Sequence, residues 1–480
     1  RRVLFRSGRM CLDAAGYQTR RGDIKRVNGK GESMTFETKG KENNGATYGR
    51  RSDWQDLYSI AKKYYEALLA DPGNALFHLT DPRGASDKSG RTFNNPYQYF
   101  FEQMHMDDAI YADESIYEYP MQQGGGNDGR PYSFGRPSSG GSKAAYPCKS
   151  YGQGRINPAY FYGIFDPNDM RRDVSITMTG SNGKGVEKLI PFVPNSKAEG
   201  GGLTLNKWDE NRQANPWVAA QRKSGINGPY MRMSEVYLGY AEVCAALGDV
   251  VTGKQYLKTV RERSFPQGLA DTDGFIASFG NDLVRAIIEE RGFEYAGEGD
   301  RRWTLIRSGY LPEDIKRIKD MTKAMMDGLA TKGYYEFENG NIISAYIWTK
   351  LVDAKTIYGH RLTAQCPMDK VNDPVLYPGW RGQKDNWEEM GLNYGNSAPA
   401  TNLAIKGLFE IVSEEEAASL ESQGYTKVNW GIDLVDNRDE YDKYLFWDYD
   451  YVSAPIYLWP FTPNVMAAGG FTNGYGFKQE

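Results

Sequence analysis

The sequence is poor in the residues that build metal centres and disulfide frameworks. Its 480 residues include only four cysteines, Cys11, Cys148, Cys244 and Cys366, and none of them forms a C-x-x-C pair. We therefore expect neither a zinc site nor a disulfide framework, and we expect Cys11 and Cys244, which fall at helix-core spacing, to be buried thiols. Long apolar runs are also absent, since none approaches the roughly 18–20 residues that a transmembrane helix needs.

The motifs of common hydrolases and nucleotide-binding enzymes are missing as well. The sequence has no H-E-x-x-H, G-x-S-x-G or G-x-x-x-x-G-K-S/T motif, and its three histidines, His78, His105 and His360, are far apart. A glycosidase needs only two suitably spaced carboxylates, but no pair stands out. The acidic clusters at 436–442 and 448–450 lack EF-hand spacing and are expected to be solvated loop charge. The sequence therefore predicts no catalytic residue, no metal site and no cofactor.

Charge of one sign is not in excess either. The 58 basic and 62 acidic residues leave a net charge of −4. A field this weak does not favour binding to nucleic acid or to an anionic membrane surface. We therefore expect no nucleic-acid partner.

Tyrosine, tryptophan and glycine, by contrast, are plentiful, with 34 Tyr, 10 Trp and 54 Gly. Two long stretches, 121–162 and 355–400, carry many of these residues and are expected to be loops. Rings in such loops can stack on the apolar face of sugars while nearby Asn, Asp and Arg bond the hydroxyls, or they can simply pin the loops to the scaffold. The candidate ligand-binding residues are Asp128, Arg130 and Tyr132 in the first stretch and Tyr377, Trp380, Arg381, Asn386 and Trp387 in the second.

Apolar residues recur at helical spacing in several segments. Residues 1–19 carry the stripe Leu4, Gly8, Cys11, Leu12 and Ala15, with small residues where another helix comes close. Further helices are predicted from Asp53 to a stop at 71–73, over 229–248, after a cap at Thr252, and over 314–330. Residues 114–119 alternate like a strand, 341–354 fit a helix or a strand, and 22–51 are predicted to form a loop.

The stretch Asn281–Ser308 has the most regular helical pattern. Asn281 is its expected N-cap, and its apolar stripe consists of Leu283, Val284, Ile287, Ile288 and Tyr295. Arg291 falls on the same stripe, so a carboxylate should lie beside it, from Glu294 or Glu298.

A glycine break divides this stretch. Gly297 and Gly299 should end the first helix, and Asp300 should cap a second one that carries Trp303 and Ile306 inward. The dense charges of the stretch are interpreted as internal ion pairs that lock one helical repeat to the next, and not as a binding site.

The order of residues in this stretch resembles the signature helix of the SusD/RagB family, surface lipoproteins that bind nutrients for outer-membrane transporters in Bacteroidetes. The resemblance is carried by Glu290-Arg291, Glu294-Tyr295-Ala296, Glu298-Gly299-Asp300-Arg301 and Trp303–Arg307. Other segments resemble further parts of the family in the expected order: a tetratricopeptide-like helix exit at 61–74, the D-P-R turn at 165–173, a repeat at 230–242, and the closing motifs at 457–463 and 473–475.

The resemblance implies a mainly α fold, in which tetratricopeptide-like helical repeats carry long irregular loops and a few short strands. It implies one SusD-like domain over 1–480, with helical repeats in 1–75 and 229–309, a ligand-facing loop region in 76–228 and a C-terminal region in 310–480. It further implies oligosaccharide capture on the outer face of the outer membrane, a SusC-like TonB-dependent transporter as partner, and a lipid anchor upstream of Arg1.

Three other functions stay open at this point. Within the family, RagB-like peptide capture would favour a deep cleft over an exposed aromatic surface. A tetratricopeptide adaptor would bind protein through helix residues, with dispensable loops. A hydrolase would need paired carboxylates in a cleft.

Overall fold

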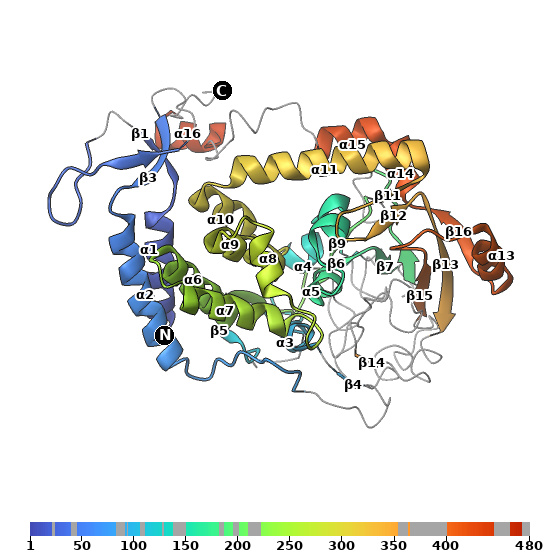
Figure 1. Cartoon of the computed structure of the whole chain (residues 1–480), viewed down its shortest axis with the longest axis horizontal. Helices are drawn as coiled ribbons and strands as arrows, with labels where there is room; N and C mark the ends of the chain where they lie inside the picture. Colours follow the sequence, from blue (N-terminus) through green and yellow to red (C-terminus); the bar gives the residue numbers. More distant parts are fainter. Residues whose placement is uncertain are drawn as a thin grey trace.

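The computed structural model describes residues 1–21, 25–39, 46–82, 92–93, 95–105, 111–126, 129–137, 150–181, 187–194, 201–209, 222–353, 363–364, 401–445 and 461–472. Within these residues the fold is mainly α-helical, as predicted, with short strands in separate small sheets. Figure 1 shows the first helices at one side, the long helix α11 (Leu311–Lys332) along the top and the strands of the C-terminal part at the other side. No described helix combines the length and apolarity that would let it cross a membrane.

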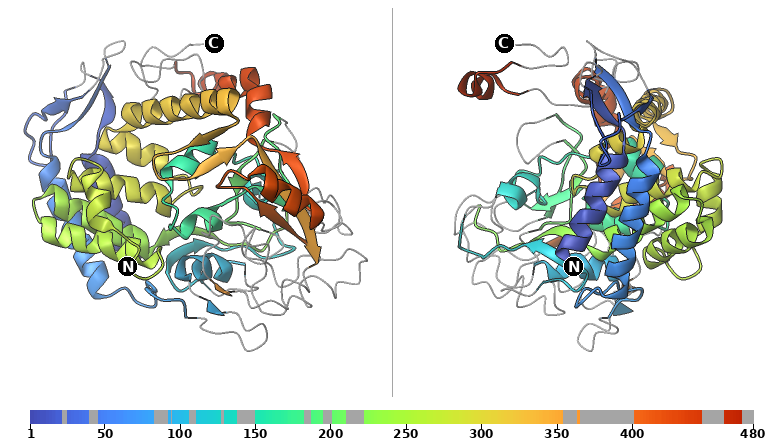
Figure 2. Two further views of the ribbon diagram at one scale, coloured as in Figure 1. Left: turned by 45° about the vertical axis from the view of Figure 1, so that its right-hand side comes forward. Right: turned by 90° about the vertical axis from the view of Figure 1, so that its left-hand side faces the viewer.

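Helices from distant parts of the sequence form one continuous stack. In chain order, each packs against the next: α1 (Arg2–Ala15), α2 (Trp54–Ala70), α6 (Met233–Ala246), α7 (Val250–Arg263), α9 (Leu283–Glu294) and α10 (Arg301–Ser308). The views in Figure 2 show the same neighbours side by side. The stack joins the two predicted repeat regions, because a single helical hairpin cannot bury its own apolar face.

Small residues let the first helices come close, as the sequence indicates. A Cβ atom at Gly8 would lie 2.9 Å from the Tyr65 ring, and one at Gly239 would lie 2.8 Å from the same ring. Tyr65 is therefore enclosed between α1, α2 and α6. In α2, Tyr58 and Tyr65 are buried, whereas Ile60 is exposed.

Several helix starts differ from the predicted caps. Asp282, and not Asn281, is the N-cap of α9 and accepts a hydrogen bond from the backbone N–H of Arg285 at 2.9 Å. Asp249, and not Thr252, caps α7. In both cases the capping side chain is one to three residues away from the residue predicted to do so, because the local pattern does not fix the turn that precedes a helix.

A second, larger core contains Phe161, Tyr162, Met325 and Trp430. The Trp430 Nε1–H donates to the Tyr162 hydroxyl at 2.8 Å and joins the C-terminal part to the middle of the chain. The other helices of the described residues are α3 (Pro96–Gln103), α4 (Gly129–Phe134), the π-helix η1 (Tyr160–Ile164), α5 (Arg171–Ser175), α8 (Thr272–Ala277), α13 (Glu414–Ser422), α14 (Gly431–Asp436), α15 (Arg438–Leu445) and α16 (Pro463–Gly469).

The strands are short and mostly antiparallel. One three-stranded sheet has the order β1 (Gln18–Arg21), β3 (Ala46–Arg51), β2 (Phe36–Thr38), and a second has the order β15 (Thr401–Lys406), β13 (Tyr346–Asp353), β16 (Thr426–Asn429). The paired strands are β5 (Ser115–Tyr119) with β10 (Gly228–Arg232), β11 (Tyr334–Glu336) with β12 (Ile342–Ser344), β6 (Ile176–Thr177) with β9 (Thr204–Leu205), β7 (Thr179–Ser181) with β8 (Glu187–Leu189), and parallel β4 (Thr92–Phe93) with β14 (Thr363–Ala364).

Three stretches that the sequence predicts as loops contain regular secondary structure. The stretch 22–51 is not one loop, since β2 and β3 lie within it and pack on the scaffold through Tyr48, whose hydroxyl donates to the backbone carbonyl of Ile306. The stretch 121–162 contains α4 and part of η1. The acidic residues 436–442 lie on α14 and α15 and not in a loop. Short strands with one face in water contain many polar residues and are hard to distinguish from a loop in the sequence. This explains why β2 and β3 were not predicted.

Other predictions agree with the structure or fall outside it. The strand at 114–119 and the helix at 314–330 are confirmed as β5 and α11, and 341–354 forms strands. Cys244 is buried as predicted, whereas Cys11 is only partly buried. Most of 355–400, residues 448–460 and 473–480, and Cys148, Cys366 and His360 lie outside the described residues.

Candidate functional site

The structure places only two of the eight candidate ligand-binding residues. Asp128 lies outside the described residues, as do Tyr377, Trp380, Arg381, Asn386 and Trp387. Arg130 and Tyr132 both lie on the short helix α4. Their surroundings therefore decide what this part of the predicted site can do.

Tyr132 is packed into the protein and does not present its ring to solvent. Its exposed fraction is 8%, the Tyr151 ring meets it edge-on with centroids 5.0 Å apart, and the Arg222 guanidinium lies 4.3 Å from its centroid. In this arrangement the ring pins α4 to the loop that follows it. This is the structural alternative that the sequence left open for each ring.

Arg130 reaches from α4 to the strand pair β5–β10. Its guanidinium carbon lies 5.9 Å from the centroid of the Tyr119 ring and 5.8 Å from that of Trp208. Gly228 makes this approach possible, since a Cβ atom there would lie only 1.3 Å from Nη1 of Arg130. The glycine thus sets the position of the guanidinium beside Tyr119.

A row of three rings, two of them exposed and one partly buried, lies on this strand pair. We call Tyr117, Tyr119 and Tyr230 the tyrosine shelf: Tyr119 and Tyr230 are 58% and 52% exposed, and the rings of Tyr117 and Tyr230 meet edge-on with centroids 5.8 Å apart. The Arg2 guanidinium covers part of the Tyr117 ring at 4.6 Å. The shelf therefore combines exposed rings with a cation at each end.

The sequence positions these rings by simple alternation. Successive side chains of a strand point to opposite faces, so Tyr117 and Tyr119 share a face while Glu118 points the other way. A register shift in β10 between Pro229 and Met231 brings Tyr230 onto the same side. The alternation of the predicted strand at 114–119 already indicates that Tyr117 and Tyr119 share a face, but the sequence does not indicate that these rings bind a ligand.

Glu118 anchors the strand from behind. Its side chain is fully buried and accepts hydrogen bonds from the Ala112 backbone N–H at 2.7 Å, the Ser115 hydroxyl at 2.6 Å and the Asn227 amide at 2.8 Å. Burial raises the pKa of this carboxyl, against the lowering effect of the hydrogen bonds. These contacts fix the face that carries the tyrosine shelf.

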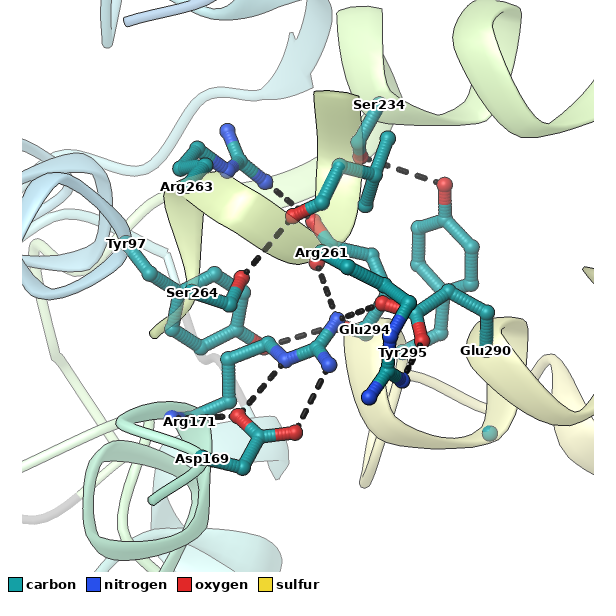
Figure 3. Close-up of polar contacts among 12 residues, drawn as sticks. Tyr97, Asp169, Arg171, Ser234, Arg261, Arg263, Ser264, Glu290, Glu294 and Tyr295 are labelled. Atoms are coloured by element: carbon teal, nitrogen blue, oxygen red, sulfur yellow. Dashed lines mark hydrogen bonds and ion pairs between the residues drawn. The ribbon is translucent and has the colours of Figure 1, made fainter. Parts of the chain in front are cut away.

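The charged residues of the signature helix converge in the protein interior. We call the buried charge cluster the set of five cations and five anions whose side chains are at most 9% exposed: Arg171, Arg232, Arg261, Arg263, Lys207, Glu114, Asp169, Glu290, Glu294 and Glu298. Figure 3 shows part of it, with Arg171 between Asp169 and the glutamates of α9. Because the ten charges balance, the cluster can be buried as a neutral unit.

Glu294 is the central anion of this cluster. It accepts hydrogen bonds from Arg232 and Arg263 at 2.5 Å each and from Arg171 at 3.1 Å. Burial alone would raise its pKa, but the three guanidinium groups hold that pKa well below its usual range. Arg171 in turn forms a bidentate pair with Asp169, at 2.9 and 2.7 Å. The D-P-R-like turn, the repeat helices and the signature helix are thereby joined, as the interpretation of these charges as scaffold ion pairs predicted.

Two details of the signature stretch differ from prediction. Arg291 pairs with Asp300, at 2.6 Å, and with neither Glu294 nor Glu298. The left-handed glycines Gly297 and Gly299, with φ of 80° and 87°, turn the chain back so that Asp300 reaches the guanidinium. Trp303, expected to point inward, is 55% exposed, whereas Ile306 is buried as predicted.

The part of the chain that the structure describes contains no candidate metal site. Across those residues, no three His, Cys, Asp or Glu side chains gather closely enough to hold a metal ion. What this part of the molecule offers to a ligand is therefore a surface of exposed rings with adjacent guanidinium groups, supported by a rigid scaffold.

Comparison with known proteins places the chain. The model of the SusD family matches residues 77–378, while none of the curated proteins matches. Similar solved structures include a SusD homolog from Bacteroides thetaiotaomicron VPI-5482, which is 17% identical over 56% of this chain and 52% of that chain, with a TM-score of 0.38. Surface glycan-binding protein A from Bacteroides thetaiotaomicron in complex with laminarihexaose is 17% identical over 54% and 52%, with a TM-score of 0.37. A SusD superfamily protein from Bacteroides fragilis NCTC 9343 is 16% identical over 64% and 53%, with a TM-score of 0.35.

The chain spans about half the length of each of these solved structures. The family match, by contrast, covers 302 of its 480 residues and includes the D-P-R-like turn and the whole signature stretch. The family predicted from the order of these motifs is therefore confirmed: the chain belongs to the SusD family.

Proposed function

We propose that the protein is a non-catalytic glycan-binding protein of the cell surface, which captures oligosaccharides and delivers them to a SusC-like TonB-dependent transporter. Membership of the SusD family supports nutrient capture in general. The observation that carries the choice of glycan is the tyrosine shelf, since two of its rings are more than half exposed on a strand pair that the interior holds rigid.

The shelf has the chemistry that a sugar needs. The C–H groups of a pyranose face pack on the flat side of a tyrosine ring, and the ring loses little conformational entropy on binding. The Arg130 guanidinium, next to Tyr119, supplies donors for the hydroxyl oxygens. Tyr117 and Tyr119 are two residues apart on one strand, which separates them by about 6.6 Å. An extended glycan can therefore contact several rings in succession.

The loop residues predicted from the sequence complete the proposal. Asp128 precedes α4 directly and would add a carboxylate acceptor beside Arg130. The second stretch would contribute Tyr377, Trp380, Arg381, Asn386 and Trp387 as a further set of rings and hydrogen-bonding groups. Tyr132 has a supporting role in this proposal, because its ring is packed against Tyr151.

Calorimetry against a panel of oligosaccharides and peptides tests the proposal. Each exposed ring should contribute about 0.5–1.5 kcal/mol to binding, so the double variant Tyr119→Ala/Tyr230→Ala should weaken glycan binding about five-fold or more. Trp380→Ala and Trp387→Ala should weaken it as well. Tyr346→Ala serves as the matched control, because it also removes a partly exposed tyrosine ring from a strand, in this case β13.

Each alternative function predicts a different result. Binding of peptides without binding of any glycan would favour RagB-like peptide capture or a tetratricopeptide adaptor. Glycan binding that is unchanged in the double variant would refute the shelf as the site. Release of shortened products from the panel would identify a hydrolase.

A further inference from the structure

A cavity of about 340 Å³ lies within the helical stack. None of its lining residues belongs to the tyrosine shelf or to α4. We call it the scaffold cavity; its walls come from α1, the start of β1, α6, α9 and α10, which lie next to one another in Figure 1. Its volume is at the lower end of the roughly 300–1,000 Å³ that is usual for small-molecule sites. The space therefore fits one small ring better than an oligomer.

A buried carboxylate without a hydrogen bond lines this cavity. Glu235 is only 7% exposed, and its carboxylate lies 3.4 Å from Nε of Arg9 and 3.7 Å from Nη2 of Arg291. Neither arginine is oriented to form a hydrogen bond with it, and no other described residue does so. Burial raises the pKa of Glu235, and the two arginines oppose that effect. The two arginines balance the charge of the carboxylate, while its oxygens retain the capacity to accept a hydrogen bond from a donor in the cavity.

Arg9 supplies the complementary group. Its side chain is 42% exposed, and within the described residues Glu235 is its one ion-pair partner. The other cations of the wall are already engaged, since Arg291 pairs with Asp300 and Arg307 pairs with Glu242. The cavity thus offers a guanidinium fork and a carboxylate side by side, both with hydrogen-bonding capacity to spare.

Trp303 adds a flat apolar wall. Its indole is 55% exposed, although the sequence predicts that this residue of α10 points inward. Leu12 and Ile306 line the same cavity. An exposed tryptophan beside an ion pair is the arrangement that a ligand with one apolar face and several hydroxyls requires.

We propose that the scaffold cavity binds a single neutral pyranose, with its apolar face on Trp303 and two neighbouring hydroxyls between Glu235 and Arg9. One hydroxyl donates to the carboxylate, and the other accepts from the guanidinium. A neutral ligand is favoured over a charged one because the wall already holds three cations, Arg9, Arg291 and Arg307, and three anions, Asp13, Glu235 and Asp300. A further charge would have to be desolvated without a counter-charge.

Saturation-transfer NMR with methyl glycosides of glucose, galactose and mannose at millimolar concentrations tests this site. The full chain carrying Tyr119→Ala/Tyr230→Ala is the starting protein, so that binding at the tyrosine shelf is weakened. We expect saturation of at least one methyl glycoside. Adding Trp303→Ala should weaken its binding about five- to ten-fold, because a stacked ring is lost. Adding Glu235→Gln should weaken it about ten-fold, because a hydrogen bond to a charged acceptor is lost.

Two controls keep the result interpretable. Tyr346→Ala, added to the same starting protein, removes a ring that does not line the cavity and should leave glycoside binding unchanged. Trp303→Ala alters an exposed residue and should leave the thermal unfolding midpoint unchanged. If Glu235→Gln destabilises the fold, Trp303→Ala therefore still tests the site.

The outcomes separate this site from the shelf. Absence of saturation for all three glycosides overturns the proposal, and so does binding that neither Trp303→Ala nor Glu235→Gln weakens. Stronger saturation of glycine or serine than of any glycoside overturns the assignment to a neutral sugar. None of these results depends on whether the shelf binds oligosaccharides, which the calorimetry of the parent protein measures separately.

Discussion

Replacing Glu294 with glutamine tests whether the buried charge cluster locks the scaffold. The substitution keeps the shape of the side chain and removes the charge that three guanidinium groups share. It leaves the cluster with five cations and four anions, so one uncompensated positive charge remains among side chains that are at most 9% exposed. Removing one partner of a buried pair costs about 3–5 kcal/mol, and we expect a loss of that size for Glu294→Gln.

The assay is unfolding in urea, followed by tryptophan fluorescence and by circular dichroism. Both probes should give a free energy of unfolding that is lower by about 3–5 kcal/mol than that of the parent. The control is Lys316→Met, which removes one partner of the ion pair with Asp320, where both side chains are more than 60% exposed. That pair is exposed to water and salt, so its loss should cost less than about 1 kcal/mol.

A double variant separates charge balance from packing. Arg263→Met alone removes a cation and leaves Glu294 and Glu114 without one partner each. Combined with Glu294→Gln, it restores a neutral cluster, so the double variant should lose at least about 1 kcal/mol less than the two single losses together. If Glu294→Gln is as mild as Lys316→Met, or if the two losses simply add, the cluster is not a charge-balanced lock.

Three further predictions concern stability and the position of Arg130. Burial raises the pKa of Glu289, but two arginines lower it to about 2 from the ordinary 4.5, so about 3 kcal/mol of stabilisation is present above pH 4.5 and is lost as the pH falls toward 2. The urea midpoint should therefore fall across that window, and it should fall less in Glu289→Gln; equal slopes would contradict this assignment. Gly16→Ala would place a Cβ atom 2.6 Å from Cβ of Arg307 and 2.8 Å from its carbonyl oxygen, so it should lower the free energy of unfolding by about 1–3 kcal/mol. Gly228→Ala should displace only the flexible end of Arg130, so calorimetry should find weaker glycan binding with an almost unchanged unfolding midpoint.

The sequence predicted those features that depend on local periodicity. The stripes of α1, α6 and α9, the strand β5 and the long helix α11 follow from apolar side chains that recur at the spacing of one buried face. The order of charged and aromatic residues in 281–308 also predicted the family, which the family match over residues 77–378 confirms.

The pairing of charges was decided by the tertiary structure. Arg291 could have reached several carboxylates within one or two turns, and the left-handed Gly297 and Gly299 select Asp300. Glu294 instead faces arginines from three other segments, up to 123 residues away in the sequence. Spacing along one helix cannot predict such partners, because they depend on how the chain folds back on itself.

The exposure of the rings was decided in the same way. Tyr132 is packed beneath its neighbours, whereas Tyr119 and Trp303 are more than half exposed. The difference arises because Tyr151 and Arg222 cover Tyr132, whereas strand alternation turns Tyr119 outward. By itself the sequence determined that this chain would build a rigid helical scaffold rich in aromatic residues. Only long-range packing determined which rings remain exposed to a ligand, because burial depends on neighbours that are distant in the chain.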